Sequence, residues 1–298
     1  MLKEVLKTFN KVLALGITGT VITVITFVFS NNVVYGLSVL VVFLAVILAI
    51  CTLSAWEVGK KEKAAKELIE REHDRHPFYS DMDIFINRFS GVQPSFDSNT
   101  QFITVVRNLS SKRPLKRSSK IEAQSLGEKT NVEVKSVRKL TISEAEKYGV
   151  RISKEVEVKL HSRPIVEVKD ERGTWKNMDF WAEFAEPLNP GESTAFEYTI
   201  KVEKGSELVD RIFKVVRYPT GKLILIVQPP QDYSIDLVKN ETVVRNETGA
   251  QEPTEIDRLK SDKCFPVVAP GGTQLTWEIK HPVVTFTYYL GYRISKLG

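Results

Sequence analysis

The sequence predicts an α+β membrane protein with an N-terminal two-helix transmembrane hairpin, a helical stalk and a C-terminal immunoglobulin-like β-sandwich region. Residues 12–56 contain no Asp, Glu, Lys or Arg, and residues 57–75 are rich in charge. After Phe96, short runs of Val, Ile, Thr and aromatic residues alternate with Gly, Pro, Asn and Asp. The expected segments are an amphipathic lead-in (1–11), the hairpin (12–56), the stalk and connector (57–95) and a cytoplasmic β-sandwich region (96–298).

The uncharged run is long enough for two membrane passages, because a bilayer core of about 30 Å needs roughly 20 helical residues. The polar triplet Ser30-Asn31-Asn32 predicts the turn between them. One continuous helix is the competing interpretation, but it would be too long for a single bilayer. A signal peptide is a second alternative, which the long apolar region and the immediate second span disfavour.

Basic residues flank both ends of the hairpin. They are Lys3, Lys7 and Lys11 before it, and Lys60, Lys61, Lys63 and Lys66 after it. The positive-inside rule then predicts an inner (cytoplasmic) membrane protein with both termini in the cytoplasm and with lipid as a partner.

Small and hydroxylated residues line one face of the first predicted span: Gly16, Gly19, Thr20, Thr23, Thr26 and Ser30. Such a stripe either lets helices pack closely, which is the commoner use, or lines a narrow aqueous path. Two helices are too few to enclose a channel, so a pore requires a homo-oligomer.

The charged segment 57–75 predicts a helix that Pro77 ends. Residues 77–95 mix aromatic, aliphatic and acidic side chains, and a short helix is one interpretation of them. His73 and His76 are three residues apart but lack a third ligand, so exposed histidines are favoured over a metal site.

Within the β region, the Pro190-Gly191 turn precedes an alternating strand and suits a chain crossing between two sheets. Residues 141–148 predict the one helix in this region, with Thr141 or Ser143 as its N-cap.

Five basic residues lie within residues 110–120, which are expected to form a mobile loop: Lys112, Arg113, Lys116, Arg117 and Lys120. This loop either collects a polyanion or is merely solvated. The net charge of +5 does not by itself indicate nucleic-acid binding.

Aromatic and basic residues also mix near the C-terminus: Trp277, Phe286, Tyr288, Tyr289 and Tyr292, with Lys280, His281 and Arg293. They could stack on bases, although burial in a core is the favoured interpretation.

No catalytic motif is present. The sequence lacks HExxH, GxSxG and CxxC motifs and a phosphate-binding glycine-rich loop. Its two cysteines, Cys51 and Cys264, do not form a disulfide framework. We therefore predict a protein that is not an enzyme and that uses no metal or cofactor.

Two predicted spans, a charged stalk and a β-rich region without an active site together resemble bacterial anti-phage membrane effectors. These include the two-spanning β-strand-rich effectors of cyclic-oligonucleotide systems and the Hailong-type channel effectors. The resemblance implies an oligomeric ion channel, such as a tetramer, gated by a nucleotide or oligonucleotide from a partner nucleotidyltransferase. The basic loop would then bind the ligand, and the small-residue stripe would line the pore. The alternative is a membrane-tethered β-sandwich binding or scaffold module without conductance.

Overall fold

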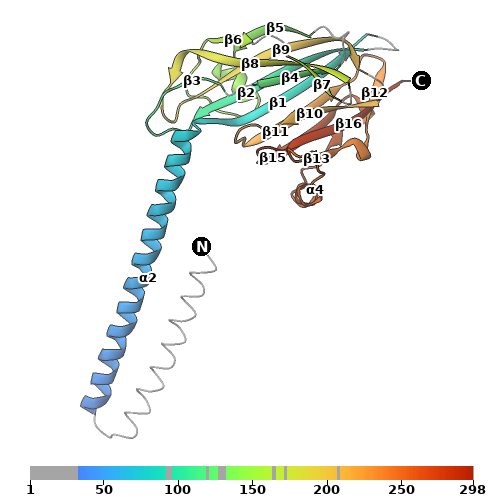
Figure 1. Ribbon diagram of the computed structural model, residues 1–298. Coiled ribbons are helices and arrows are strands. Elements are labelled where there is room, and N and C mark those ends of the chain that lie inside the picture. Colours follow the sequence, from blue (N-terminus) through green and yellow to red (C-terminus); the bar gives the residue numbers. More distant parts are fainter. Residues whose placement is uncertain are drawn as a thin grey trace. The chain divides into compact units, whose positions relative to one another are not determined.

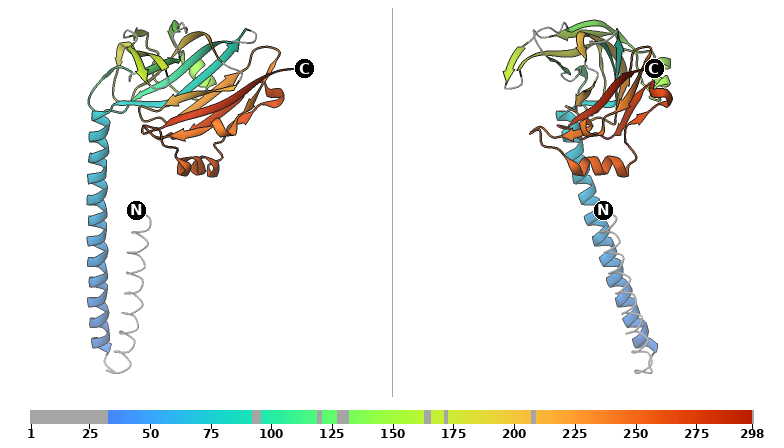
Figure 2. Two further views of the ribbon diagram at one scale, coloured as in Figure 1. Left: turned by 45° about the vertical axis from the view of Figure 1, so that its right-hand side comes forward. Right: turned by 90° about the vertical axis from the view of Figure 1, so that its right-hand side faces the viewer.

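The computed structural model describes residues 33–91, 96–118, 121–126, 132–162, 166–170, 173–206 and 209–297. The chain divides into two compact units, Met1–Arg71 and Glu72–Gly298. Strands make up most of the regular structure (Figure 1). They lie in the second unit, which Figure 2 shows from two further directions.

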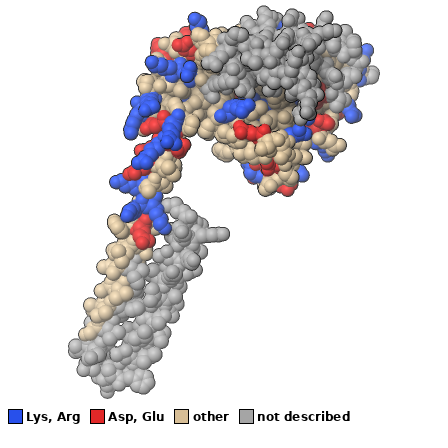
Figure 3. Space-filling model, viewed as in Figure 1, with Lys and Arg blue, Asp and Glu red and all other residues tan. Residues whose placement is uncertain are grey.

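Helix α2 (Val33–Arg75) is 43 residues long. Its first part is apolar, and Lys, Arg and Glu alternate along its later turns (Figure 3). The helix ends at Arg75 because Pro77 disfavours helical backbone in the residue before it and cannot donate a backbone hydrogen bond. The predicted charged helix 57–75 thus lies inside α2, and its last four residues, Glu72–Arg75, belong to the second unit.

Among the described residues, no helix combines the length and the apolar character that a bilayer crossing requires. This finding overturns the predicted transmembrane hairpin, the membrane-protein class and the inner-membrane localisation with cytoplasmic termini. The prediction relied on the absence of charge, but residues 33–56 continue without a break into the charged turns of one helix. The first predicted span and its stripe, Gly16 to Ser30, lie outside the described residues.

The described residues of the second unit form three sheets. Sheet A has the order β14-β15-β11-β1-β2-β9-β5. Its strands are β14 (Val267–Val268), β15 (Leu275–Lys280), β11 (Lys222–Gln228), β1 (Phe78–Ser90), β2 (Phe96–Asn108), β9 (Ser193–Ser206) and β5 (Val132–Lys139). In sheet B, β8 (Gly173–Leu188) pairs with β3 (Leu115–Arg117), β4 (Ile121–Leu126), β6 (Val158–Ser162) and β7 (Val166–Asp170). In sheet C, β16 (Thr287–Lys296) pairs with β10 (Val209–Val215), β12 (Tyr233–Leu237) and β13 (Val243–Arg245).

This topology also corrects the predicted immunoglobulin-like sandwich, which consists of two antiparallel sheets. Sheet A is mixed, because β1 pairs in parallel with β11 and antiparallel with β2. β1 lies at the centre of that sheet, although the sequence assigned residues 77–95 to a connector and allowed a short helix there.

The two faces of sheet A bury different residues because side chains alternate along a strand. Phe85 and Phe89 of β1 face the sheet B and sheet C side, whereas Ile84 and Ile86 face the opposite side. One core lies between sheets A and C and includes Leu225, Trp277 and Tyr292. A second lies between sheets A and B and includes Phe184, Phe196 and Tyr198.

The opposite face of sheet A is covered by α3 (Ile142–Lys147), which buries Ala145 against Ile84 and Ile103. Thr141 is its N-cap, as one of the two sequence alternatives predicted. The remaining short elements are α4 (Pro253–Ser261), η1 (Lys239–Glu241) and η2 (Pro270–Gly272). Trp277, Tyr288 and Tyr292 are at most 1% exposed, so the core interpretation of these C-terminal aromatics is confirmed.

Candidate anion-binding cavity

The predicted basic loop separates into residues with different positions. Lys112 and Arg113 lie in the turn before β3, Lys116 and Arg117 lie on β3, and Lys120 is outside the described residues. The four described residues are exposed.

The turn that carries Lys112 and Arg113 is ordered by buried polar groups. The Asn108 amide donates to the carbonyl oxygens of Arg113 and Leu188, at 2.8 Å each. The Ser110 hydroxyl accepts hydrogen bonds from the backbone N–H of Lys112 (3.1 Å) and Arg113 (2.8 Å). Asn108 and Ser110 are at most 2% exposed. The expected mobile loop is therefore a turn with its backbone held by local hydrogen bonds.

Asp74, in the last turn of α2, is held by the same turn. Its Oδ1 accepts hydrogen bonds from the Ser110 hydroxyl (2.8 Å) and the Ser111 backbone N–H (3.0 Å). The Ser110 hydrogen bond is the main reason why the pKa of Asp74 lies below its usual value. Lys112 Nζ lies 4.0 Å from Asp74 Oδ2. These contacts place the end of α2 next to β3.

A cavity of about 920 Å³ opens between the end of α2, the start of β1, β3 and the segment after β10. Its lining is formed by Glu72, His73, Arg75, His76, Pro77, Phe78, Tyr79, Leu109, Leu115, Arg117, Ser118, Trp181, Arg217, Tyr218, Pro219 and Val284. Every lining residue belongs to the second unit.

Three arginines from distant parts of the sequence line this cavity, against a single glutamate. Nη1 of Arg75 lies 3.5 Å from Oε1 of Glu72, and Nη1 of Arg217 lies 3.7 Å from Oε1 of Glu247. Arg117 has no ion-pair partner in the part of the chain that the structure describes, although Glu183 is its cross-strand neighbour. Glu183 Oε2 instead lies 2.5 Å from Nε2 of His161. With neutral histidines, the lining carries a formal charge of +2.

Aromatic rings form one part of the apolar lining, beside Pro77, Leu109, Leu115, Pro219 and Val284. The rings of Phe78 and Tyr218 pack edge to face, with centroids 4.6 Å apart and planes at 76°. Trp181 is half-buried on β8. Its ring stacks on that of His161 of β6, with ring centroids 5.5 Å apart and ring planes at 9°. The pKa of Tyr79 is raised, mainly by burial, so its phenol stays neutral at physiological pH. The cavity therefore joins guanidinium groups to aromatic surfaces.

Of the four predicted ligand residues that the structure describes, Arg117 alone lines this cavity. Arg75, Arg217 and Trp181 were not predicted, because each comes from a different element and no local motif marks it. The sequence feature that pointed to the cavity was the basic character of residues 110–120, which include Arg117 on β3.

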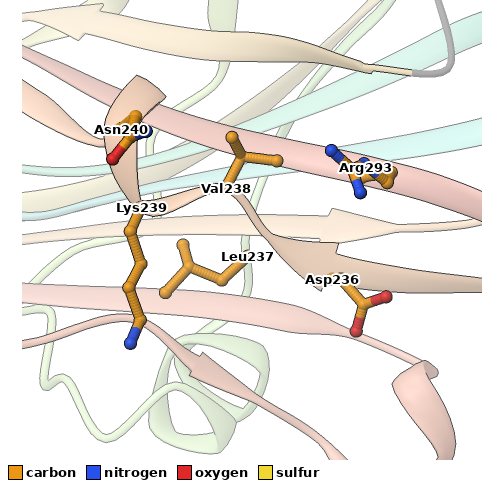
Figure 4. Close-up of a pocket in the computed structure, with 6 residues that line it drawn as sticks. All are labelled: Asp236, Leu237, Val238, Lys239, Asn240 and Arg293. Atoms are coloured by element: carbon orange, nitrogen blue, oxygen red, sulfur yellow. The ribbon is translucent and has the colours of Figure 1, made fainter.

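A second, smaller pocket of about 270 Å³ lies at the end of β12. Asp236 and Arg293, which line it, are direct cross-strand partners, and Lys239 extends away from both (Figure 4). Its lining contains no aromatic side chain. The described residues contain no group of three or more His, Cys, Asp or Glu side chains suited to a metal ion.

No family model and no curated protein matches this chain. Among solved structures, a putative protease from Parabacteroides distasonis ATCC 8503 aligns with a TM-score of 0.36 and 8% identity, over 73% of this chain and 40% of that one. The leukotriene A4 hydrolase of Saccharomyces cerevisiae aligns with a TM-score of 0.33 and 7% identity, over 72% of this chain and 29% of that one. The chain thus spans less than half the length of these proteins, and likenesses this weak carry no argument about its fold or activity.

Proposed function

We propose that the second unit is a non-catalytic binding module for an anionic ligand with an aromatic ring, of the nucleotide or oligonucleotide class. The observation that carries this proposal is the convergence of Arg75, Arg117 and Arg217 with Trp181 around one cavity. Guanidinium groups bind phosphate through paired hydrogen bonds, and aromatic side chains stack on bases. The volume lies within the usual range of small-molecule sites, about 300–1,000 Å³.

The proposal keeps the nucleotide ligand and the partner nucleotidyltransferase that the resemblance implies. It omits ion conduction, because conduction depended on the predicted membrane spans. Under this proposal the ligand is bound and released unchanged, and the arginines and aromatic rings recognise its phosphate and its base.

A charge deletion on β3 tests the cavity directly. Arg117 and Lys116 are adjacent, exposed and equally charged, but only Arg117 lines the cavity. Arg117→Gln should weaken the binding of ATP or a short single-stranded DNA by about 10- to 100-fold in calorimetry, because it removes a charged hydrogen-bond donor. Lys116→Gln, the matched control, should change the Kd by less than about twofold at physiological ionic strength.

Three outcomes contradict the proposal. One is a wild-type protein that binds neither probe, and another is an equal loss of affinity in both variants. The third is conversion of ATP during the incubation, measured by chromatography of the recovered nucleotide.

A second candidate function, a self-associating scaffold, is favoured by α2. Val42, Val46, Ala49, Leu53 and Trp56 are exposed and recur at alternating spacings of four and three residues. This is the spacing of an apolar stripe that packs against another helix. A second copy of α2 offers the same stripe, so a homo-oligomer would bury it. The tetramer implied by the resemblance is one such assembly.

A further inference from the structure

A buried carboxylate lies beneath the aromatic part of the cavity. Asp83 of β1 is 6% exposed. Its Oδ1 accepts a hydrogen bond from the Ser80 hydroxyl at 2.9 Å, and its Oδ2 accepts one from the Tyr218 hydroxyl at 2.9 Å. Neither Asp83 nor Ser80 lines the cavity, whereas Tyr218 does.

The backbone around Tyr218 is fixed to β1 at an irregularity of the strand. The register between β1 and β2 shifts between Ser80 and Met82. At this bulge the Ser80 N–H donates to the Pro219 carbonyl (3.0 Å), and the Gly221 N–H donates to the Ser80 carbonyl (2.8 Å). The segment 218–221 is therefore hydrogen-bonded to β1 at the bulge. Bulges are common next to functional sites, where they change the direction of a side chain.

The side chain of Tyr218 is thus held at both ends. The backbone that follows it is bonded to Ser80 through Pro219 and Gly221, and its hydroxyl is bonded to Asp83. Burial is the main cause that raises the pKa of Tyr218 well above its ordinary value, so the phenol stays protonated and donates to the carboxylate. Between these two anchors, the ring packs edge to face on Phe78.

We infer that Asp83 is a positioning residue that, through Tyr218, sets the preference of the cavity for aromatic anions over inorganic ones. Asp83 holds the ring whose edge-to-face packing with Phe78 forms part of the aromatic lining. The arginines act on phosphate independently of that ring. This inference rests on the proposed function, because it assigns the origin of selectivity at the same site.

The test compares ATP with inorganic pyrophosphate. Tyr218→Phe keeps the ring and removes only its bond to Asp83. The affinity for ATP should fall about tenfold, while the affinity for pyrophosphate stays within about twofold. A purely structural role would weaken both ligands together, so the ratio of the two affinities is the informative readout.

Tyr288→Phe is the control for loss of a buried tyrosine–carboxylate hydrogen bond, and it also removes the hydrogen bond that the Tyr288 hydroxyl accepts from the Val283 N–H at 2.8 Å. Tyr288 donates a hydrogen bond of the same length, 2.9 Å, to another buried carboxylate, Glu255, outside the cavity lining. It should lose at least as much thermal stability as Tyr218→Phe and keep the wild-type ratio. Asp83→Ala should lower the ratio as Tyr218→Phe does, and the double variant should be no worse than either single variant, because both changes remove the same interaction.

The outcomes separate the inference from the proposed function. A wild-type protein that binds neither ATP nor pyrophosphate overturns both. If the wild-type protein prefers ATP and Tyr218→Phe retains that preference, the inference is overturned and the proposed function stays in place. The same holds if Tyr288→Phe loses the preference as much as Tyr218→Phe does.

Discussion

Gly221 lies where the 218–221 segment approaches the bulge of β1. A Cβ atom at this position would lie 2.8 Å from the Asp81 carbonyl oxygen and 2.8 Å from the Tyr79 hydroxyl. The Asp81 atom belongs to the backbone of β1 at the bulge, between Ser80 and Met82, so it cannot move aside without disturbing the pairing of those two residues with β2. Glycine is therefore required here by space rather than by an unusual φ angle.

Gly221→Ala should destabilise the protein by about 1–3 kcal/mol, the usual cost of inserting atoms into a packed site. Urea unfolding followed by tryptophan fluorescence measures this change. Gly59→Ala is the contrasting control, because no atom lies within 4 Å of a Cβ at that helical position. There the substitution should raise helicity through the higher helix propensity of alanine. An unchanged urea midpoint for Gly221→Ala would contradict the close approach.

Among the elements, α3 is stabilised by a reciprocal capping box. The Thr141 hydroxyl accepts a hydrogen bond from the Glu144 N–H (3.2 Å), and a Glu144 carboxylate oxygen accepts one from the Thr141 N–H (2.9 Å). Arg138 adds an ion pair to Glu144 at 2.8 Å. The Thr141 N–H and Arg138 together lower the pKa of Glu144 from 4.5 to about 2.

This shift predicts a pH dependence with a defined sign. Because the folded state lowers the pKa of Glu144, the group contributes stability above about pH 4.5, which is lost as the pH falls towards about 2. Glu144→Gln should therefore flatten the acid limb of the stability profile, measured as thermal midpoint against pH between those values. Glu146→Gln, which removes a carboxylate outside the capping box, should keep the wild-type slope. A parallel loss of slope in both variants would assign the effect to general charge.

The same element shows which features are predictable from sequence. The N-cap of α3 was among the sequence alternatives because a capping signal spans four adjacent residues. The Pro190-Gly191 turn between β8 and β9 was predicted for the same reason, and Gly191 adopts a φ of 79° there. Local chemistry decides both features, so no knowledge of the tertiary structure is needed.

β1 was missed because its pattern is irregular for physical reasons. The bulge after Ser80 changes which residues face the core, and Asp83 occupies an inward position with its charge hydrogen-bonded rather than solvated. Both features interrupt the apolar alternation that identifies a strand. The cavity was only partly predictable in the same way, since Arg117 belongs to a visible basic run while Arg75, Arg217 and Trp181 meet it through tertiary pairing alone.

At the scale of the whole molecule, the exposed stripe on α2 predicts self-association. Leu53 lies on the stripe and Leu48 lies off it, and the two are similarly exposed, at 63% and 68%. Leu53→Glu should convert an oligomer to a monomer, because it places a charge in the packed interface. Leu48→Glu should leave the assembly intact. Light scattering coupled to size-exclusion chromatography measures both masses, and a monomeric wild-type protein would contradict the scaffold candidate.

The parallel pairing of β1 with β11 has a consequence for how the chain folds during synthesis. Arg88 and Gln228, which meet across this pair, are 140 residues apart in sequence. At a synthesis rate of about 5–20 residues per second, β1 leaves the ribosome on the order of ten seconds before its parallel neighbour. β2 follows at once and covers one edge of β1, but the other edge stays without a partner for that interval. We expect the centre of sheet A to close late, and we expect the nascent chain to depend on chaperones until β11 arrives.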